Sequence, residues 1–174
     1  MRKRFCILIV IVFALAAVAF RAAAYPRAVN YSFNQIGTNE GLSSSYIKAI
    51  TQDCNGFMWF GTKNGLNRYD GKTVKSFYCY DYENQRGNNN ISSIYASPEG
   101  KLWVGTDRGI YVYDPGNDTF TFLGHKSAEG VSADDWVQDI IPDNRGNIWV
   151  LIPNQGIFRY FGDNQVDYYP VIHD

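Results

Sequence analysis

The sequence contains few of the residues that usually carry catalysis or bind metal ions. Among its 174 residues there are two histidines, His125 and His173, and three cysteines. Neither histidine lies in a recognisable nucleophile setting, so the sequence gives no support to Ser–His or Cys–His catalysis. We therefore predict no catalytic residue, no metal site and no cofactor.

Positive charge is scarce outside the first residues. The chain has 16 lysines and arginines against 17 acidic residues, and four of the basic residues lie within residues 1–24. Without that segment the formal net charge is −5, with 12 basic and 17 acidic residues. Because no basic patch or arm remains, nucleic acid is an unfavourable partner.

A long apolar run occurs once, as the 16 residues from Phe5 to Phe20. It follows a basic start and precedes three alanines that end at Ala24. This order is typical of a secretory signal peptide, so we predict one over residues 1–24. A membrane anchor is the weaker alternative, because a spanning helix needs about 20 apolar residues.

A segment with the pattern Gly-x-Φ-Trp-Φ, in which Φ is apolar, begins at Gly56, Gly100 and Gly146. Its tryptophans are 44 and 46 residues apart. Self-similarity at 40–50 residues is the signature of a β-propeller, in which each repeat is one four-stranded blade. The sequence therefore predicts an all-β fold with three four-stranded blades.

The strands of each blade can be placed around this segment. Ile47, Ile91 and Val137 open the expected first strands, and the tryptophan segments are the second strands. Turns containing Gly65, Gly109 and Gly156 precede the third strands. The fourth strands lie around Phe77, Phe122 and Tyr168. The predicted blades are residues 45–80, 90–123 and 136–171.

Residues 31–36 resemble a lone fourth strand, because Phe33 precedes Ile47 by 14 residues, as Phe77 precedes Ile91. Many propellers close their ring with such an N-terminal strand, which removes open sheet edges. Propellers generally need four to eight blades. We therefore expect an incomplete ring that belongs to the front of a longer protein.

Two cysteines, Cys54 and Cys79, follow the predicted signal peptide. They fall in the first turn and the outermost strand of one blade. Three strand spacings of ~4.8 Å would separate them by roughly 14 Å, which is beyond disulfide reach. We predict two unpaired thiols.

Residues 33–71 carry the pattern Phe33-x-x-Ile-Gly-Thr-x-x-Gly41-Leu-Ser, then Ile47-x-x-Ile50-x-Gln-Asp53, and then the tryptophan segment followed by Gly65-Leu-Asn-Arg-Tyr-Asp-Gly71. This resembles the two-component regulator propeller repeat, found in the periplasmic sensor regions of hybrid two-component systems in Bacteroides-type bacteria. The resemblance is strong in the first blade, good in the second and loose in the third, where Leu151-Ile-Pro153 replaces Gly-Thr.

The resemblance implies a periplasmic location and partners within a longer parent chain, namely further blades and a histidine kinase. The kinase parts are not in this sequence, which has no phosphoacceptor histidine context and no ATP-binding glycine box. An oligosaccharide or other small ligand is the implied partner, and the sequence leaves a homodimer open.

Several residues that could suggest function have simpler explanations. Trp59, Trp103 and Trp149 could stack on sugars, but they recur at one apolar position, and we predict that they fill the space between blades. Asp53 and Asp143 begin tight turns rather than calcium loops, because the twelfth-position glutamate is missing. The other candidates, the glycosidase-like carboxylates Asp134-Asp135 and Asp81/Glu83, are better explained as solvated loop charge.

The best binding surface follows from topology. Connections from fourth to first strands and from second to third strands emerge on the same face of a propeller, here residues 37–45, 81–90, 124–135, 62–64, 106–108 and 152–155. Polar groups beside an aromatic suit a carbohydrate, although solvated loops explain this composition almost as well. The predicted contact residues are Tyr46, Lys63, Asn64, Asn90, Asp107, Arg108, Trp136, Asn154 and Gln155.

We favour the N-terminal part of a periplasmic propeller sensor that detects a glycan or related nutrient. An exported propeller enzyme, a freestanding binding module and a truncated remnant are the alternatives.

Overall fold

The computed structural model describes residues 31–83, 85–124, 131–162 and 165–171. Of the described residues, those from Ile36 onward belong to one compact unit and residues 31–35 to another. The predicted signal peptide and both histidines lie outside the described residues. In the described part of the chain, no helix is long and apolar enough to cross a membrane.

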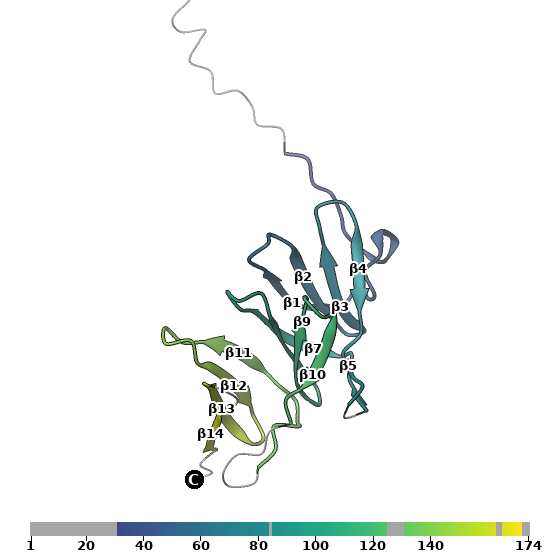
Figure 1. Cartoon of the computed structure of the whole chain (residues 1–174). Coiled ribbons are helices and arrows are strands. Elements are labelled where there is room, and N and C mark those ends of the chain that lie inside the picture. Colours follow the sequence, from purple (N-terminus) through teal and green to yellow (C-terminus); the bar gives the residue numbers. More distant parts are fainter. Residues whose placement is uncertain (1–30, 84, 125–130, 163–164, 172–174) are drawn as a thin grey trace, which may run out of the picture. The chain divides into compact units, whose positions relative to one another are not determined.

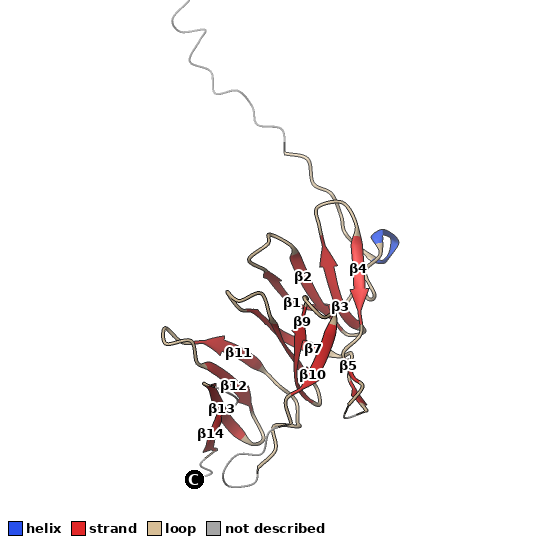
Figure 2. Ribbon diagram, viewed as in Figure 1, coloured by secondary structure: helices blue, strands red, loops and turns tan. Residues whose placement is uncertain are grey.

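Three antiparallel four-stranded sheets make up the larger unit, as predicted for the all-β propeller (Figures 1 and 2). Each sheet has its strands in chain order, so every neighbouring pair is joined by a short turn. Blade 1 contains β1 (Ile47–Gln52), β2 (Met58–Thr62), β3 (Gly65–Tyr69) and β4 (Val74–Phe77). Blade 2 contains β7 (Ile91–Ala96), β8 (Leu102–Thr106), β9 (Gly109–Asp114) and β10 (Thr119–Phe122). Blade 3 contains β11 (Asp139–Pro142), β12 (Ile148–Ile152), β13 (Gly156–Phe161) and β14 (Gln165–Pro170).

Two short elements were not expected from the sequence. The connection between blades 1 and 2 forms a hairpin of β5 (Tyr80–Asp81) and β6 (Arg86–Gly87). A single 3-10 turn, η1 (Thr38–Glu40), precedes blade 1. The hairpin packs against β10, so it extends the outer edge of blade 2.

Residues 31–36 are not in a strand in this structure. A strand exists only with a ladder partner, and none of the described strands pairs with these residues. The closing strand therefore stays a prediction.

The first strands of the three blades, β1, β7 and β11, pack against one another in order. Two apolar cores lie between the blades. The first core joins blades 1 and 2 around Trp59, Leu66 and Tyr113, and the second joins blades 2 and 3 around Val150 and Phe158. Stability therefore comes from contacts between neighbouring blades, because each sheet buries its faces only against another sheet.

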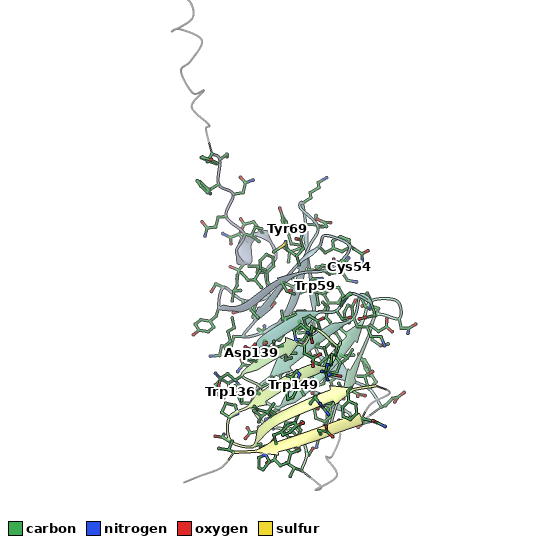
Figure 3. All side chains as sticks on the ribbon, turned by 90° about the vertical axis from the view of Figure 1, so that its left-hand side faces the viewer. Cys54, Trp59, Tyr69, Trp136, Asp139 and Trp149 are labelled. Carbon is green, nitrogen blue, oxygen red and sulfur yellow. The ribbon has the colours of Figure 1, made fainter. Side chains whose placement is uncertain are left out.

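The tryptophans confirm the predicted core role at two of three positions. Trp59 is 1% exposed in the first core, and Trp103 is half-buried against the second core. Trp149 is half-buried on blade 3, on the side away from blade 2. Figure 3 shows Trp59 and Trp149 on different sheets.

The turns at Asp53 and Asp143 are tight turns, as predicted. Oδ1 of Asp53 accepts the N–H groups of Asn55 and Phe57, at 2.9 and 3.0 Å. Oδ1 of Asp143 accepts two backbone N–H groups in the same way. These carboxylates serve the turn, and within the described residues no cluster of His, Cys, Asp or Glu could hold a metal ion.

The two cysteines are unpaired, which confirms the prediction. Cys54 is exposed, and Cys79 is fully buried in the first core. Burial raises the pKa of the Cys79 thiol well above its usual value, so this side chain is an inert apolar group.

Candidate functional site

A pocket of about 530 Å³ lies where three polar connections of the chain meet. The connections are the β5–β6 hairpin, the turn between β8 and β9, and the segment that leads from blade 2 to blade 3. These are the loop types predicted to share one propeller face. The lining residues are Gln85, Arg86, Gly87, Asp107, Arg108, Tyr111, Asp134 and Asp135.

Backbone hydrogen bonds hold the loops of this face together. The N–H of Lys63 donates to the carbonyl of Tyr46, and the N–H of Asp107 donates to the carbonyl of Asn90, at 3.1 and 3.2 Å. Each bond joins a β2–β3-type turn to the residue before a first strand. In blade 3 the equivalent position is Pro153, which has no N–H to donate. The third copy of this contact is therefore missing.

Threonines at the ends of β2 and β8 shape the two regular turns. Thr62 and Thr106 are fully buried, and each donates its hydroxyl to the carbonyl of the next glycine, at 2.9 Å in both cases. Each hydroxyl also accepts a turn N–H, from Asn64 and Arg108, at 3.1 Å. These bonds fix the backbone from which the side chain of Arg108 reaches the pocket.

Asp107 is the most constrained predicted residue in the pocket. Its Oδ2 accepts a hydrogen bond from Nδ2 of Asn90 at 3.0 Å. Oδ1 of Asn90 in turn accepts a hydrogen bond from Nζ of Lys48 at 2.9 Å. Its Oδ1 is buried and has no hydrogen-bond partner among the described residues. A buried acceptor of this kind costs free energy until a donor reaches it, so it favours a ligand hydroxyl or amine.

The pocket also contains two guanidinium groups. Arg86 lies with its guanidinium 4.9 Å from the centre of the Phe122 ring, and Arg108 is exposed. Neither forms an ion pair within the described part of the chain. Beneath them Tyr111 is 2% exposed, and burial raises the pKa of its hydroxyl to about 12, so it stays neutral at physiological pH.

Asp135 connects the pocket to blade 3. Its Oδ1 accepts the N–H of Trp136 at 2.7 Å, and its Oδ2 accepts the Nδ2 of Asn154 at 3.4 Å. Trp136 is 43% exposed beside this bridge. Figure 3 places Trp136 and the turn residue Cys54 on opposite sides of the molecule, so the pocket loops and the first hairpin turns lie at opposite ends of the blades.

The structure places the nine predicted contact residues in different settings. Asp107 and Arg108 line the pocket, while Asn90, Trp136 and Asn154 are linked to its wall by hydrogen bonds. Three more, Tyr46, Lys63 and Asn64, are exposed on the turns of blade 1. The ninth, Gln155, has its backbone carbonyl bonded to Tyr168 and its Oε1 buried without a partner among the described residues.

Sequence reasoning missed Arg86 and Tyr111 and set aside Asp134 and Asp135. Arg86 lies in a two-residue strand, which is too short to show a period, and Tyr111 follows the apolar pattern of a third strand. The sequence favours solvated loop charge for Asp134 and Asp135. The structure brings them to the pocket because the connection between blades 2 and 3 passes over the β8–β9 turn, where the N–H of Gly109 donates to the carbonyl of Asp135.

Comparison with known proteins agrees with the repeat and the fold. The model of the two component regulator propeller matches residues 41–64 and 85–108. A histidine kinase P4 from Formosa agariphila is 37% identical over 68 residues, which are 39% of this chain and 5% of that protein. This chain therefore spans a small part of the curated relative.

Solved structures share the fold. The extracellular domain of a protein assigned as a hybrid two-component system of B. thetaiotaomicron superposes with a TM-score of 0.68 and 26% identity, covering 79% of this chain and 20% of that one. Virginiamycin B lyase from Staphylococcus aureus superposes with a TM-score of 0.55 and 15% identity, covering 74% of this chain and 42% of the lyase, and shows the fold alone. The repeated motif, the three blades and the two matched segments agree, so this chain is similar to the two component regulator propeller in sequence over the matched residues and to the solved extracellular domain in fold.

Proposed function

We propose that this chain is the N-terminal part of the periplasmic ligand-sensing propeller of a hybrid two-component sensor histidine kinase, and that it detects a glycan or a related nutrient. The match of residues 41–64 and 85–108 to the two component regulator propeller supports the sensor role. The similar solved structure from B. thetaiotaomicron is an extracellular domain, which supports an exported location.

The observation that carries the ligand proposal is the pocket at Asp107 and Arg108. It combines two guanidinium groups and a buried carboxylate oxygen, which have no ion-pair partner and no donor, respectively, among the described residues, with a nearby exposed indole at Trp136. Sugar hydroxyls can accept from guanidinium groups and donate to carboxylates, while an aromatic face suits a pyranose ring. A neutral or acidic oligosaccharide would use all three groups.

Signalling would follow from differential affinity. A ligand shifts an equilibrium between two sensor arrangements only if it binds one of them more tightly. The pocket is formed by the connection between blades 1 and 2, a turn of blade 2 and the connection between blades 2 and 3, so a ligand bound there would favour the arrangement that keeps these segments together.

Calorimetric titration of the chain with an oligosaccharide panel tests the proposal. We expect a saccharide from the panel to bind, and Arg108→Gln to weaken it at least tenfold, because a charged hydrogen bond is worth about 1.5–3 kcal/mol. Arg145→Gln makes the same change in the exposed β11–β12 turn and should leave binding unchanged. If no saccharide binds, or both variants bind equally, the glycan proposal fails.

A propeller enzyme is the second candidate, because three carboxylates line the same pocket. Chromatography of the panel after incubation with the chain separates the two. Cleaved saccharides would identify an enzyme, whereas a bound and intact saccharide supports the sensor.

A further inference from the structure

The two junctions between blades use the same aromatic contact. Trp59 of blade 1 meets Tyr113 of blade 2 edge-on, with ring centres 5.6 Å apart and planes at 60°. Trp103 of blade 2 contacts Tyr160 of blade 3 in the same way, with ring centres 5.4 Å apart and an angle of 65° between the ring planes. Both tyrosines lie four residues after the glycine that opens the third strand of their blade. The tryptophan of one blade and this tyrosine of the next therefore form a repeated joint.

A glycine two residues after each of these tryptophans allows the close approach. A Cβ on Gly61 would lie 2.6 Å from Cγ2 of Ile91, and a Cβ on Gly105 would lie 2.6 Å from Cγ1 of Val137. Ile91 and Val137 are equivalent residues at the start of the first-strand segment of the following blade. The branched side chain of one blade thus occupies the space that glycine leaves in the other.

Blade 3 presents the same surface on its free side. We call the side of blade 3 that points away from blade 2 its forward face, comprising Trp149, Leu151, Ile157, Arg159 and Tyr169. The guanidinium of Arg159 lies 5.6 Å from the centre of the Trp149 ring, and Tyr169 stacks on Trp149 at 5.7 Å. In blade 1 the equivalent groups are Arg68 and Phe77, which meet Trp59 at 5.8 and 5.4 Å.

The apolar side chains of this face are more exposed to solvent than the equivalent side chains of blades 1 and 2. At the third-strand position that faces forward, Leu66 and Ile110 are 0% exposed, whereas Ile157 is 39% exposed. At the neighbouring fourth-strand position, Phe77 is 6% exposed and Tyr169 is 43% exposed. The equivalent residues are buried at both existing junctions, so the forward face of blade 3 is half of a third junction.

One residue makes this third junction different. Leu151 occupies the position that Gly61 and Gly105 hold in blades 1 and 2. Each of the three residues pairs with the apolar residue of the third strand that lies on the forward side, namely Ile157, Leu66 and Ile110. A leucine side chain fills the space that receives Ile91 and Val137 at the other junctions. A blade with a branched residue at that position would collide with Leu151.

We infer that the forward face of blade 3 binds a four-stranded blade of the same repeat that carries a tyrosine at the position of Tyr113 and Tyr160 and a small residue at the position of Ile91 and Val137. This inference rests on the proposed function only in that a longer parent chain would supply the blade. A second copy of this chain is the competing occupant. It would present Ile47 at the critical position and meet the same collision with Leu151.

The test adds a blade of known sequence to the full chain. A duplicate of residues 78–123, which form blade 2 and its incoming connection, is appended after Asp174, with Ile91→Ala in the duplicate. Hydrogen exchange of β12 and β13 peptides then reports whether the forward face is covered. We expect exchange of these peptides to slow at least tenfold with the Ile91→Ala duplicate and to change little with the unaltered duplicate.

Two further variants separate docking from folding. Leu151→Gly in the chain should restore protection with the unaltered duplicate, because it recreates the Gly61–Ile91 arrangement. Tyr113→Ala in the duplicate should reduce protection about two- to tenfold, as expected for the loss of one aromatic pair.

Three outcomes would overturn the inference. If the Ile91→Ala and the unaltered duplicates protected β12 and β13 equally in the chain with Leu151, Leu151 would not exclude a branched residue at this position. Absence of protection in every variant, including Leu151→Gly, would show that the face does not accept a blade. Tyr69 holds the position of Tyr113 and Tyr160 in blade 1. A stable dimer of the unextended chain that Tyr69→Ala dissociates would therefore identify a second copy as the occupant. Failure of the glycan titration would leave these readouts unchanged, so the two proposals fail separately.

Discussion

An aspartate in the turn between the first two strands holds the tryptophan in blades 1 and 3. Oδ2 of Asp53 accepts the indole N–H of Trp59 at 2.7 Å, and Oδ2 of Asp143 accepts that of Trp149 at 3.0 Å. In blade 2 the position is Ser97, whose hydroxyl accepts the N–H of Lys101. The aspartate orients the ring, so the junction between blades 1 and 2 depends on Asp53, a residue that lies outside the apolar core.

The Asp143 turn predicts a pH dependence of stability. The indole N–H of Trp149, followed by bonds from Asn147 and Arg145, holds the pKa of the Asp143 carboxyl well below its usual value. A lowered pKa means that the folded state binds the proton less readily than the unfolded state. The stabilisation is therefore present above the unfolded pKa of about 3.9 and is lost as the pH falls below it.

Asp143→Asn should remove this dependence, because an amide does not titrate and its NH₂ group would face the indole N–H. The measurement is the urea midpoint of unfolding at several pH values between 3 and 6. The midpoint of the wild type should fall more steeply toward pH 3 than that of the variant. Asp134→Asn, at an exposed carboxylate, is the matched control, and an equal flattening in both variants would contradict the prediction.

At the scale of single elements, the β5–β6 hairpin protects the edge of blade 2. Asp81 is 3% exposed, and its Oδ2 accepts the N–H of Phe122 at 2.7 Å, while its Oδ1 accepts the N–H of Glu83 at 2.9 Å. The Phe122 N–H belongs to β10, the outer strand of the blade. A free N–H on an edge strand is a site for pairing with other chains, and the carboxylate covers it.

Asp81→Ala should leave the buried Phe122 N–H without this acceptor and lower the free energy of unfolding by about 1–3 kcal/mol. The direct readout is hydrogen exchange at the amide of Phe122, which should accelerate together with that of neighbouring β10 amides. Tyr82→Ala changes an 83% exposed residue of the same connection and should alter neither quantity. Unchanged exchange at Phe122 in Asp81→Ala would exclude the protective role.

The elements that could be predicted from the sequence are those that repeat. The Gly-x-Φ-Trp-Φ segments gave the three blades, because each copy supports the register of the others. The hairpin at Tyr80–Asp81 and Arg86–Gly87 occurs once, and its two-residue strands show no period. Asn67 was also missed. It is fully buried where blades 2 and 3 have Tyr111 and Phe158, and its Oδ1 accepts the N–H of Ser43, a contact across 24 residues that no local pattern indicates.

The candidate site was predictable in location but not in composition. Topology alone indicated the loop face, and it brought Asp107 and Arg108 to the pocket. Arg86 and Tyr111 reach the same pocket from a hairpin and a core strand, and their approach depends on how blade 2 packs against the connections. That packing is a tertiary property, so sequence spacing could not supply it.

At the scale of the whole molecule, blade 2 belongs to both apolar cores. Its forward residues, such as Ile110, pack in the second core, and its opposite face, including Val104 and Tyr113, packs in the first. Blades 1 and 3 have no shared core. An arrangement in which each unit contacts only its neighbours has a stability that is approximately a sum over units and junctions. A substitution that destabilises one junction should therefore leave the other junction folded.

A reciprocal pair of variants tests this arrangement. Phe158→Ala removes a fully buried ring from the second core, and Leu66→Ala removes a fully buried side chain from the first. Such substitutions cost about 2–5 kcal/mol. In hydrogen exchange, Phe158→Ala should reduce protection of β11–β14 while β1–β4 stay protected, and Leu66→Ala should do the reverse. Blade 2, which retains one intact junction in either variant, should lose less than the affected outer blade. Uniform loss of hydrogen-exchange protection across all three blades in both variants would instead show that the blades unfold as one cooperative unit. The free forward face of blade 3 would then destabilise the whole molecule rather than blade 3 alone.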